Sequence, residues 1–136
     1  MKTLAATYCR FTMQAPSHIK LHKKSQTLEL IFDDQLYTLS SEFLRVWSPS
    51  AEVRGHGKGQ EVLQTGKKLV EIRGIEAVGN YAIKLLFNDG HDTGIYSWDY
   101  LLELGQNHDQ LWHQYLDRLQ QAGASRQPAE IGRWTN

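Results

Sequence analysis

Apolar and polar residues alternate early in the chain with the two-residue period of a β-strand. Between Thr27 and Asp33, the side chains of Leu28, Leu30 and Phe32 fall on one face. The turn-forming run 33–35 follows, and a second apolar stretch runs from Leu36 to Leu39. This pattern predicts a β-hairpin.

A short helix is predicted after the hairpin. Ser40 or Ser41 can cap its first turn, and Pro49 ends it because the proline ring cannot continue a helix. Its apolar side carries Phe43, Leu44 and Trp47. The following residues, 48–68, are polar and rich in glycine, which predicts a surface loop.

Two further strands are predicted at Leu69–Val78 and Tyr81–Phe87. Gly79-Asn80 between them is a two-residue hairpin signal, and Gly74 interrupts the alternation as a β-bulge would. Beyond them, Asp89-Gly90 favours a type I′ turn that would place Asn88 opposite His91.

The last third of the chain has the period of α-helices. Ser97 can cap a helix that Gly105 would end, and Asn107 with Gln110 resembles the capping box of a second one. The second helix repeats apolar residues at helical spacing up to Gly123, and we expect its stripe to face the sheet. The residues expected to face the sheet are Leu111, Trp112, Tyr115 and Leu119, with Leu116 at the edge of the stripe.

Strands followed by helices predict an α+β fold. We expect a mainly antiparallel β-sheet with a short helix after the first hairpin and two C-terminal helices packed on one face. The expected domain spans residues 17–126, between a flexible leader at 1–16 and a flexible tail at 127–136.

Charge and hydropathy then exclude several classes of protein. Basic and acidic residues balance at 15 each, with a sequence pI near 7.0, so no overall field favours nucleic acid. The apolar run Ala82–Phe87 is far too short to cross a membrane. Met1 to Thr7 has no secretory pattern, and the lone Cys9 cannot form an internal disulfide, so we expect a cytoplasmic protein.

Common catalytic motifs are also missing, so we expect no enzyme activity from the chain by itself. No histidine is followed two residues later by an acidic residue, as the iron dioxygenases require. The run 55–60 lacks the spacing of a phosphate loop. The sequence holds no C-x-x-C, H-E-x-x-H or G-x-S-x-G pattern.

Several motifs carry a resemblance to a known family. They are LRVWSPSAEV (44–53), GHG (55–57), VGNYA (78–82), DGH (89–91) and YSW (96–98). From about Ser17 to Arg126 the chain resembles small bacterial proteins once grouped as a domain of unknown function. These proteins are similar to the N-terminal domain of gamma-butyrobetaine hydroxylase. In that enzyme the domain holds a structural zinc through a C-x-C-x-x-C run and a histidine.

The positions matching those zinc ligands are Ser48, Ser50, Val53 and His91, so only the histidine is kept. Hydroxyls are poor zinc ligands and valine is none, which argues against the family's zinc here. A weaker metal site remains as an alternative, in which His91 and His56, aided by Glu52, bind iron or zinc. The competing interpretation is that both histidines make only structural hydrogen bonds.

The leading functional hypothesis is a stand-alone accessory domain that binds another protein. The resemblance extends to a plant iron–sulfur scaffold ATPase, which implies a link to iron or iron–sulfur protein maturation. Candidate partner-binding residues are Arg45, Ser48, Ser50, Glu52, Arg54 and Asp89. Trp47 and Trp98 lie on apolar helix faces, where a core position competes with an interface role. The basic run 18–24 is expected to be solvated.

Overall fold

The computed structural model describes residues 14–55 and 61–128, which form two three-stranded antiparallel sheets and four helices. One sheet has the order β1 (His18–His22), β2 (Thr27–Phe32) and β3 (Gln35–Ser40). The other has the order β4 (Ile72–Val78), β5 (Ala82–Phe87) and β6 (Ile95–Ser97). The helices are α2 (Ser41–Val46), α3 (Ala51–Arg54), α4 (Trp98–Gln106) and α5 (His108–Ala122). The predicted α+β class is confirmed, as is antiparallel pairing.

The first sheet contains the predicted hairpin. Phe32 pairs with Gln35, and the turn residues Asp33 and Asp34 both have positive φ, at 48° and 64°. Aspartate tolerates this left-handed conformation better than most residues, which explains the tight turn. The basic run forms an edge strand, β1, which pairs with β2 along its full length.

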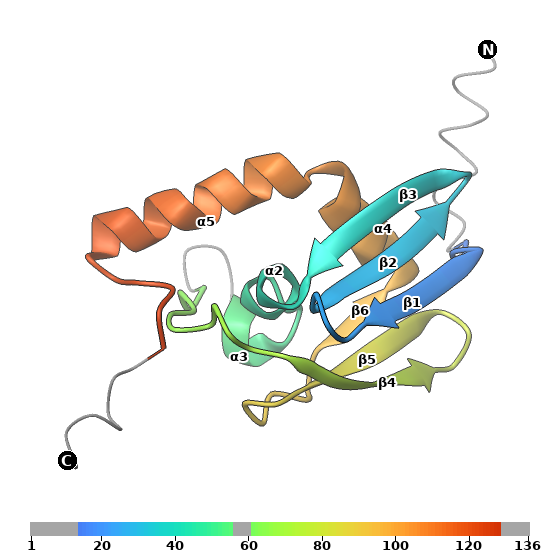
Figure 1. Ribbon diagram of the computed structural model, residues 1–136, viewed down its shortest axis with the longest axis horizontal. Helices are drawn as coiled ribbons and strands as arrows, with labels where there is room; N and C mark the ends of the chain where they lie inside the picture. The colour runs from blue at the N-terminus through green and yellow to red at the C-terminus, as the bar shows by residue number, and fades with distance from the viewer. Residues whose placement is uncertain (1–13, 56–60, 129–136) are drawn as a thin grey trace.

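The core lies between the sheets and the helices that follow them. Alternate residues of β2 are buried, as are Leu85 and Phe87 on β5. These side chains join one apolar cluster with α2 and α4. Figure 1 shows the two sheets stacked, with α2 and α3 beside the ends of their strands and α5 along the outside.

Helix α2 is buried along its whole length, although it carries two charged residues, Glu42 and Arg45. Ser40 is its N-cap and accepts a hydrogen bond from the backbone N–H of Phe43, so the predicted cap is confirmed. Both buried charges are paired with residues far along the chain, as burial of an ion requires.

Helix α4 begins as predicted but does not end at Gly105. Ser97 caps it by accepting from the N–H of Tyr100, and the helix continues to Gln106. A Cβ atom on Gly105 would lie 2.6 Å from Cδ1 of Tyr37. This glycine therefore allows the helix to approach β3, and the prediction that it ends the helix is wrong.

Helix α5 ends as predicted, because Gly123 takes the left-handed conformation with a φ of 64°. It also begins as predicted, directly after Asn107, but the Asn107 side chain makes no capping bond to the helix, so the predicted capping box is not formed. Its buried residues, Tyr115 and Leu119, pack against Val46 of α2. These two residues therefore face a helix where a sheet was expected, whereas Leu111 and Trp112 of the same stripe pack against the main core cluster that the strands share.

Two predictions for the middle of the chain need correction. The 48–68 segment contains helix α3, which Ser50 caps by accepting from the N–H of Glu52. The turn after β5 is not type I′, because Asp89 does not have positive φ and Gly90 does. The N–H of Phe87 bonds the carbonyl of His91, so His91 faces Phe87 where Asn88 was expected.

The predicted bulge at Gly74 is confirmed by a register shift in β4.

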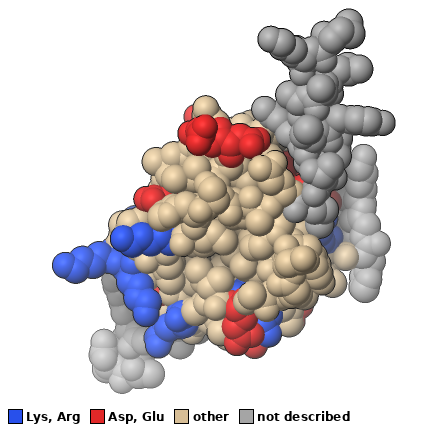
Figure 2. All heavy atoms as spheres, turned by 90° about the vertical axis from the view of Figure 1, so that its right-hand side faces the viewer, with Lys and Arg blue, Asp and Glu red and all other residues tan. Residues whose placement is uncertain are grey.

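The described part of the chain contains no helix that is both long and apolar enough to cross a bilayer. On the face that shows the tips of the hairpins, acidic groups lie at the top and bottom edges and basic groups at the lower left and bottom (Figure 2). The centre of this face is a broad uncharged area. This face therefore presents no continuous field of one sign.

Candidate functional site

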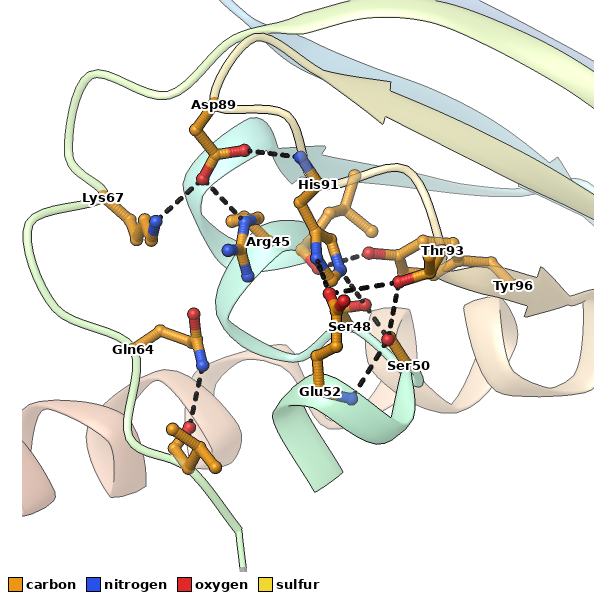
Figure 3. A network of polar contacts seen from close by, with 12 residues as sticks. Arg45, Ser48, Ser50, Glu52, Gln64, Lys67, Asp89, His91, Thr93 and Tyr96 are labelled. Atoms are coloured by element: carbon orange, nitrogen blue, oxygen red, sulfur yellow. Dashed lines mark hydrogen bonds and ion pairs between the residues drawn. The ribbon is translucent and has the colours of Figure 1, made fainter. Parts of the chain in front are cut away.

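A polar network joins two segments that lie about forty residues apart in the sequence. The segment from Ser48 to Arg54 follows α2, and the segment from Asp89 to Thr93 follows β5. Figure 3 shows the side chains of both segments pointing toward one another. Ser48 is 1% exposed and His91 is 5% exposed, so the centre of this network is buried.

His91 lies at the centre of the network, and both of its ring nitrogens have partners. Its Nδ1 is 3.0 Å from Oε1 of Glu52, and its Nε2 is 2.8 Å from Oγ of Ser48. An ionised carboxylate only accepts hydrogen bonds, so Nδ1 carries the proton of the neutral ring. The hydroxyl of Ser48 therefore donates to Nε2.

Electrostatics favour this neutral form. Burial, followed by the nearby Arg45 guanidinium, lowers the pKa of His91, and Glu52 opposes that change. The imidazole is therefore uncharged at neutral pH. In that state each of its nitrogens matches the partner that the fold supplies.

Asp89 connects the network to two cations. Its Oδ2 atom is 2.9 Å from Nε of Arg45 and 2.7 Å from Nζ of Lys67, and its Oδ1 accepts from the backbone N–H of His91. Burial opposes ionisation of Asp89, but the bonds from Lys67 and the backbone and the charge of Arg45 outweigh it. They lower its pKa to about 2.

The remaining hydroxyls close the network. Ser50 Oγ is 2.7 Å from Oγ1 of Thr93, which also donates to Glu52. The hydroxyl of Tyr96 donates to the carbonyl of Leu44 at 2.6 Å, and burial raises the pKa of this tyrosine. The two segments are thus tied by several bonds between buried or partly buried groups.

The order Glu52, His91, Ser48 is the hydrogen-bond order of a catalytic triad. Ser48 Oγ, however, already accepts a bond from the backbone N–H of Ser50 at 3.2 Å. A Cβ on Gly94 would lie only 2.5 Å from that oxygen, so the backbone closes this side as well. Ser48 belongs to the lining of a neighbouring cavity but is only 1% exposed, and these groups enclose its oxygen, so the geometry supports a structural role.

The proximity of His91 to Ser48, which the resemblance implied, is present in the structure. His56 lies outside the described residues. Within the described ranges, 14–55 and 61–128, no cluster of three or more His, Cys, Asp or Glu side chains is arranged to hold a metal ion. Ser48 and Ser50 are buried, whereas Glu52 and Arg54 are exposed.

Arg45 is likewise buried, while the side chain of Asp89 is 24% exposed. Any direct contact between a partner and this region would therefore fall on exposed groups such as Glu52 and Arg54. The buried candidates hold those groups in position.

A cavity of about 540 Å³ lies beside the network, and the sequence did not reveal it. Its lining includes Trp47, Arg54, Tyr100, Leu111, Tyr115 and Arg118. The spacing of the last three residues places them on one face of α5. From the sequence, that spacing could indicate that the three residues share a face. Only the packing of α5 on α2 shows that this face lines a cavity.

Arginine and aromatic side chains pair in the lining of this cavity. The guanidinium carbon of Arg54 lies 4.8 Å from the centre of the Tyr100 ring, and that of Arg118 lies 5.5 Å from the Trp47 ring. The indole N–H of Trp47 is buried and has no hydrogen-bond partner among the described residues. The cavity wall therefore offers aromatic and guanidinium stacking surfaces.

Comparison with known proteins places the chain in a family. Residues 19–102 match the model described as gamma-butyrobetaine hydroxylase-like, N-terminal. An NMR solution structure is 55% identical, covers 87% of this chain and 94% of that chain, and has a TM-score of 0.77. A second NMR structure is 56% identical, covers 84% and 86%, and has a TM-score of 0.72.

A more distant structure is also similar. It is the crystal structure of a protein with unknown function from the DUF971 family of Acidithiobacillus ferrooxidans. That protein is 34% identical, covers 68% of this chain and 94% of that chain, and has a TM-score of 0.57. Among curated proteins, no match is found. The family match spans more than half of the sequence, and the chain therefore belongs to the gamma-butyrobetaine hydroxylase-like N-terminal family.

Proposed function

We propose that this chain is an accessory domain that binds another protein, with the cavity beside α3 as its binding site. The observation that carries the proposal is the lining of that cavity. Tryptophan, tyrosine and arginine are the residues that dominate the binding energy of protein interfaces. Here they line a recess of about 540 Å³ with a largely aromatic and aliphatic wall.

The proposed occupant is an extended segment of the partner that carries an apolar or aromatic side chain. Such a side chain matches the aliphatic lining, to which Leu111 contributes. The resemblance suggests a partner from iron or iron–sulfur protein maturation.

The polar network holds one wall of this cavity in place. Helix α3 contributes Arg54 to the cavity, and the bonds of Ser50 and Glu52 hold that short helix in place. A preorganised wall loses little conformational entropy when a ligand binds. The network and the cavity therefore act together, although only the cavity contacts the partner.

A peptide selection tests the proposal. A random-peptide library is panned on the full chain, and the affinity of enriched peptides is measured by fluorescence polarisation. We expect Arg118→Ala to weaken binding by about tenfold or more, because it removes one charged wall of the cavity. The matched control is Arg73→Ala, an exposed arginine on β4 that does not line the cavity.

Two results would overturn the proposed site. One is a library in which no peptide is enriched over an unrelated protein of similar size. The other is a set of enriched peptides that bind Arg118→Ala and wild type equally well. Amide chemical shifts in the wild-type chain locate the bound peptide and should change at Trp47 and Tyr115.

A further inference from the structure

The family resemblance implies a structural zinc at the position of the polar network, and this chain's residues do not fit it. Zinc in a structural site takes about four ligands, most of them thiolate or imidazole. The chain supplies hydroxyls at Ser48 and Ser50, and an apolar side chain at Val53. The nitrogens of His91 already bond Ser48 and Glu52, so a metal ion would have to displace one of them.

The same groups satisfy one another without an ion. Ser48 donates to His91 and accepts from the N–H of Ser50, and Ser50 also accepts from the N–H of Glu52. Buried polar groups are destabilising when unpaired, and here the hydroxyls of Ser48 and Ser50 and both ring nitrogens of His91 are paired, so none of them is left waiting for a metal. Val53 is 6% exposed and packs as an apolar residue.

We infer that Glu52, His91 and Ser48, together with the Ser50–Thr93 bond, form a metal-independent clasp. The clasp holds the α3 segment against the turn that follows β5. It joins positions 39 to 43 residues apart, which is the mechanical task that a structural ion performs elsewhere. Its bonds are made by folding alone, so the domain needs no bound ion to be stable. This inference is independent of the proposed partner site.

The first test measures the wild-type chain. The protein is purified without nickel resin and without chelator, and its metal content is measured by plasma mass spectrometry. We expect far less than one equivalent of zinc or iron, and the same melting temperature with and without a strong chelator. One equivalent of bound metal, or a melting temperature that falls on chelation, would overturn the inference.

The second test asks whether the clasp occupies a metal-competent position. In the variant Ser48→Cys, Ser50→Cys, Val53→Cys, three thiols join His91. We expect this variant, but not wild type, to bind one cobalt ion with the absorption of a tetrahedral thiolate site, and to melt at higher temperature with zinc. A variant that folds and yet binds no cobalt would overturn the inference that the clasp of Ser48, Ser50 and His91 stands where a metal ion would be held.

Single substitutions distinguish the loss of the clasp's hydrogen bonds from a general destabilisation of the fold. Ser48→Ala removes the donor to His91, and we expect a lower melting temperature that added zinc does not restore. Thr38→Ala, on the exposed face of β3, is the matched control and should melt like wild type. Recovery of the Ser48→Ala variant by zinc would point to a native metal site.

Discussion

The ion pair between Arg126 and Glu42 allows a sharp test of how the C-terminal segment is held. Glu42 lies on α2 with its side chain 7% exposed, and Arg126 lies beyond the last helix. Nε of Arg126 is 2.8 Å from Oε2 and Nη2 is 2.7 Å from Oε1, so both carboxylate oxygens are bonded. The guanidinium also stacks on Trp112 at 5.0 Å.

We expect Arg126→Ala to destabilise the fold, because it leaves a buried carboxylate without a partner. Removing one member of a fully buried pair costs about 3–5 kcal/mol. The Arg126 side chain is 34% exposed, so water would reach Glu42 after the change and reduce the loss. We therefore expect a loss of about 2–3 kcal/mol in the free energy of unfolding.

Urea denaturation followed by tryptophan fluorescence and circular dichroism measures this loss, and a thermal scan should show a melting point lower by about 10 °C. The double variant Arg126→Ala, Glu42→Gln should be more stable than Arg126→Ala alone, because no charge is left stranded. The reasoning is refuted if Arg126→Ala unfolds within about 0.5 kcal/mol of wild type, or if the added Glu42→Gln gives no recovery.

Three further predictions concern helix packing and ionisation. Leu119→Ala should cost about 2–3 kcal/mol in urea denaturation, since Leu119 is 5% exposed, whereas Leu36→Ala, at 58% exposed, should stay within about 0.5 kcal/mol. Gly105→Ala should lose about 1–2 kcal/mol despite better helix propensity, because the new methyl group meets Tyr37; equal or higher stability would contradict this contact. Burial raises the pKa of Tyr115 from 10.0 to about 12, so its contribution to stability is complete below pH 10 and is lost as the pH rises toward 12. Melting curves from pH 9 to 12 should therefore fall more steeply for wild type than for Tyr115→Phe, and parallel curves would refute the shift.

Local physical chemistry made much of the fold predictable. The serine caps at Ser40 and Ser97 were identified correctly, because a cap depends only on a side chain and the next few amides. The first hairpin and the glycine end of α5 follow from the same kind of short-range signal. Gly105 misled the prediction, because its role is set by a tyrosine on a distant strand.

The candidate site was predictable only in part. The resemblance brought His91 and Ser48 together, and the structure agrees. Residue types alone did not show that these side chains are buried, nor that Glu52 completes the bonds of the histidine. Burial depends on which segments cover a residue, and that information is spread over the whole chain.

By itself the sequence determined the two central hairpins, the three longer helices, the serine caps of two of them and the lack of familiar catalytic motifs. Tertiary structure decided that α5 packs on α2, that a cavity opens beside α3, and that Arg126 neutralises Glu42. The physical reason is the separation in sequence between the residues that interact. Caps, turns and periodicity are interactions among near neighbours, whereas cavities and buried ion pairs form only when segments far apart in sequence meet.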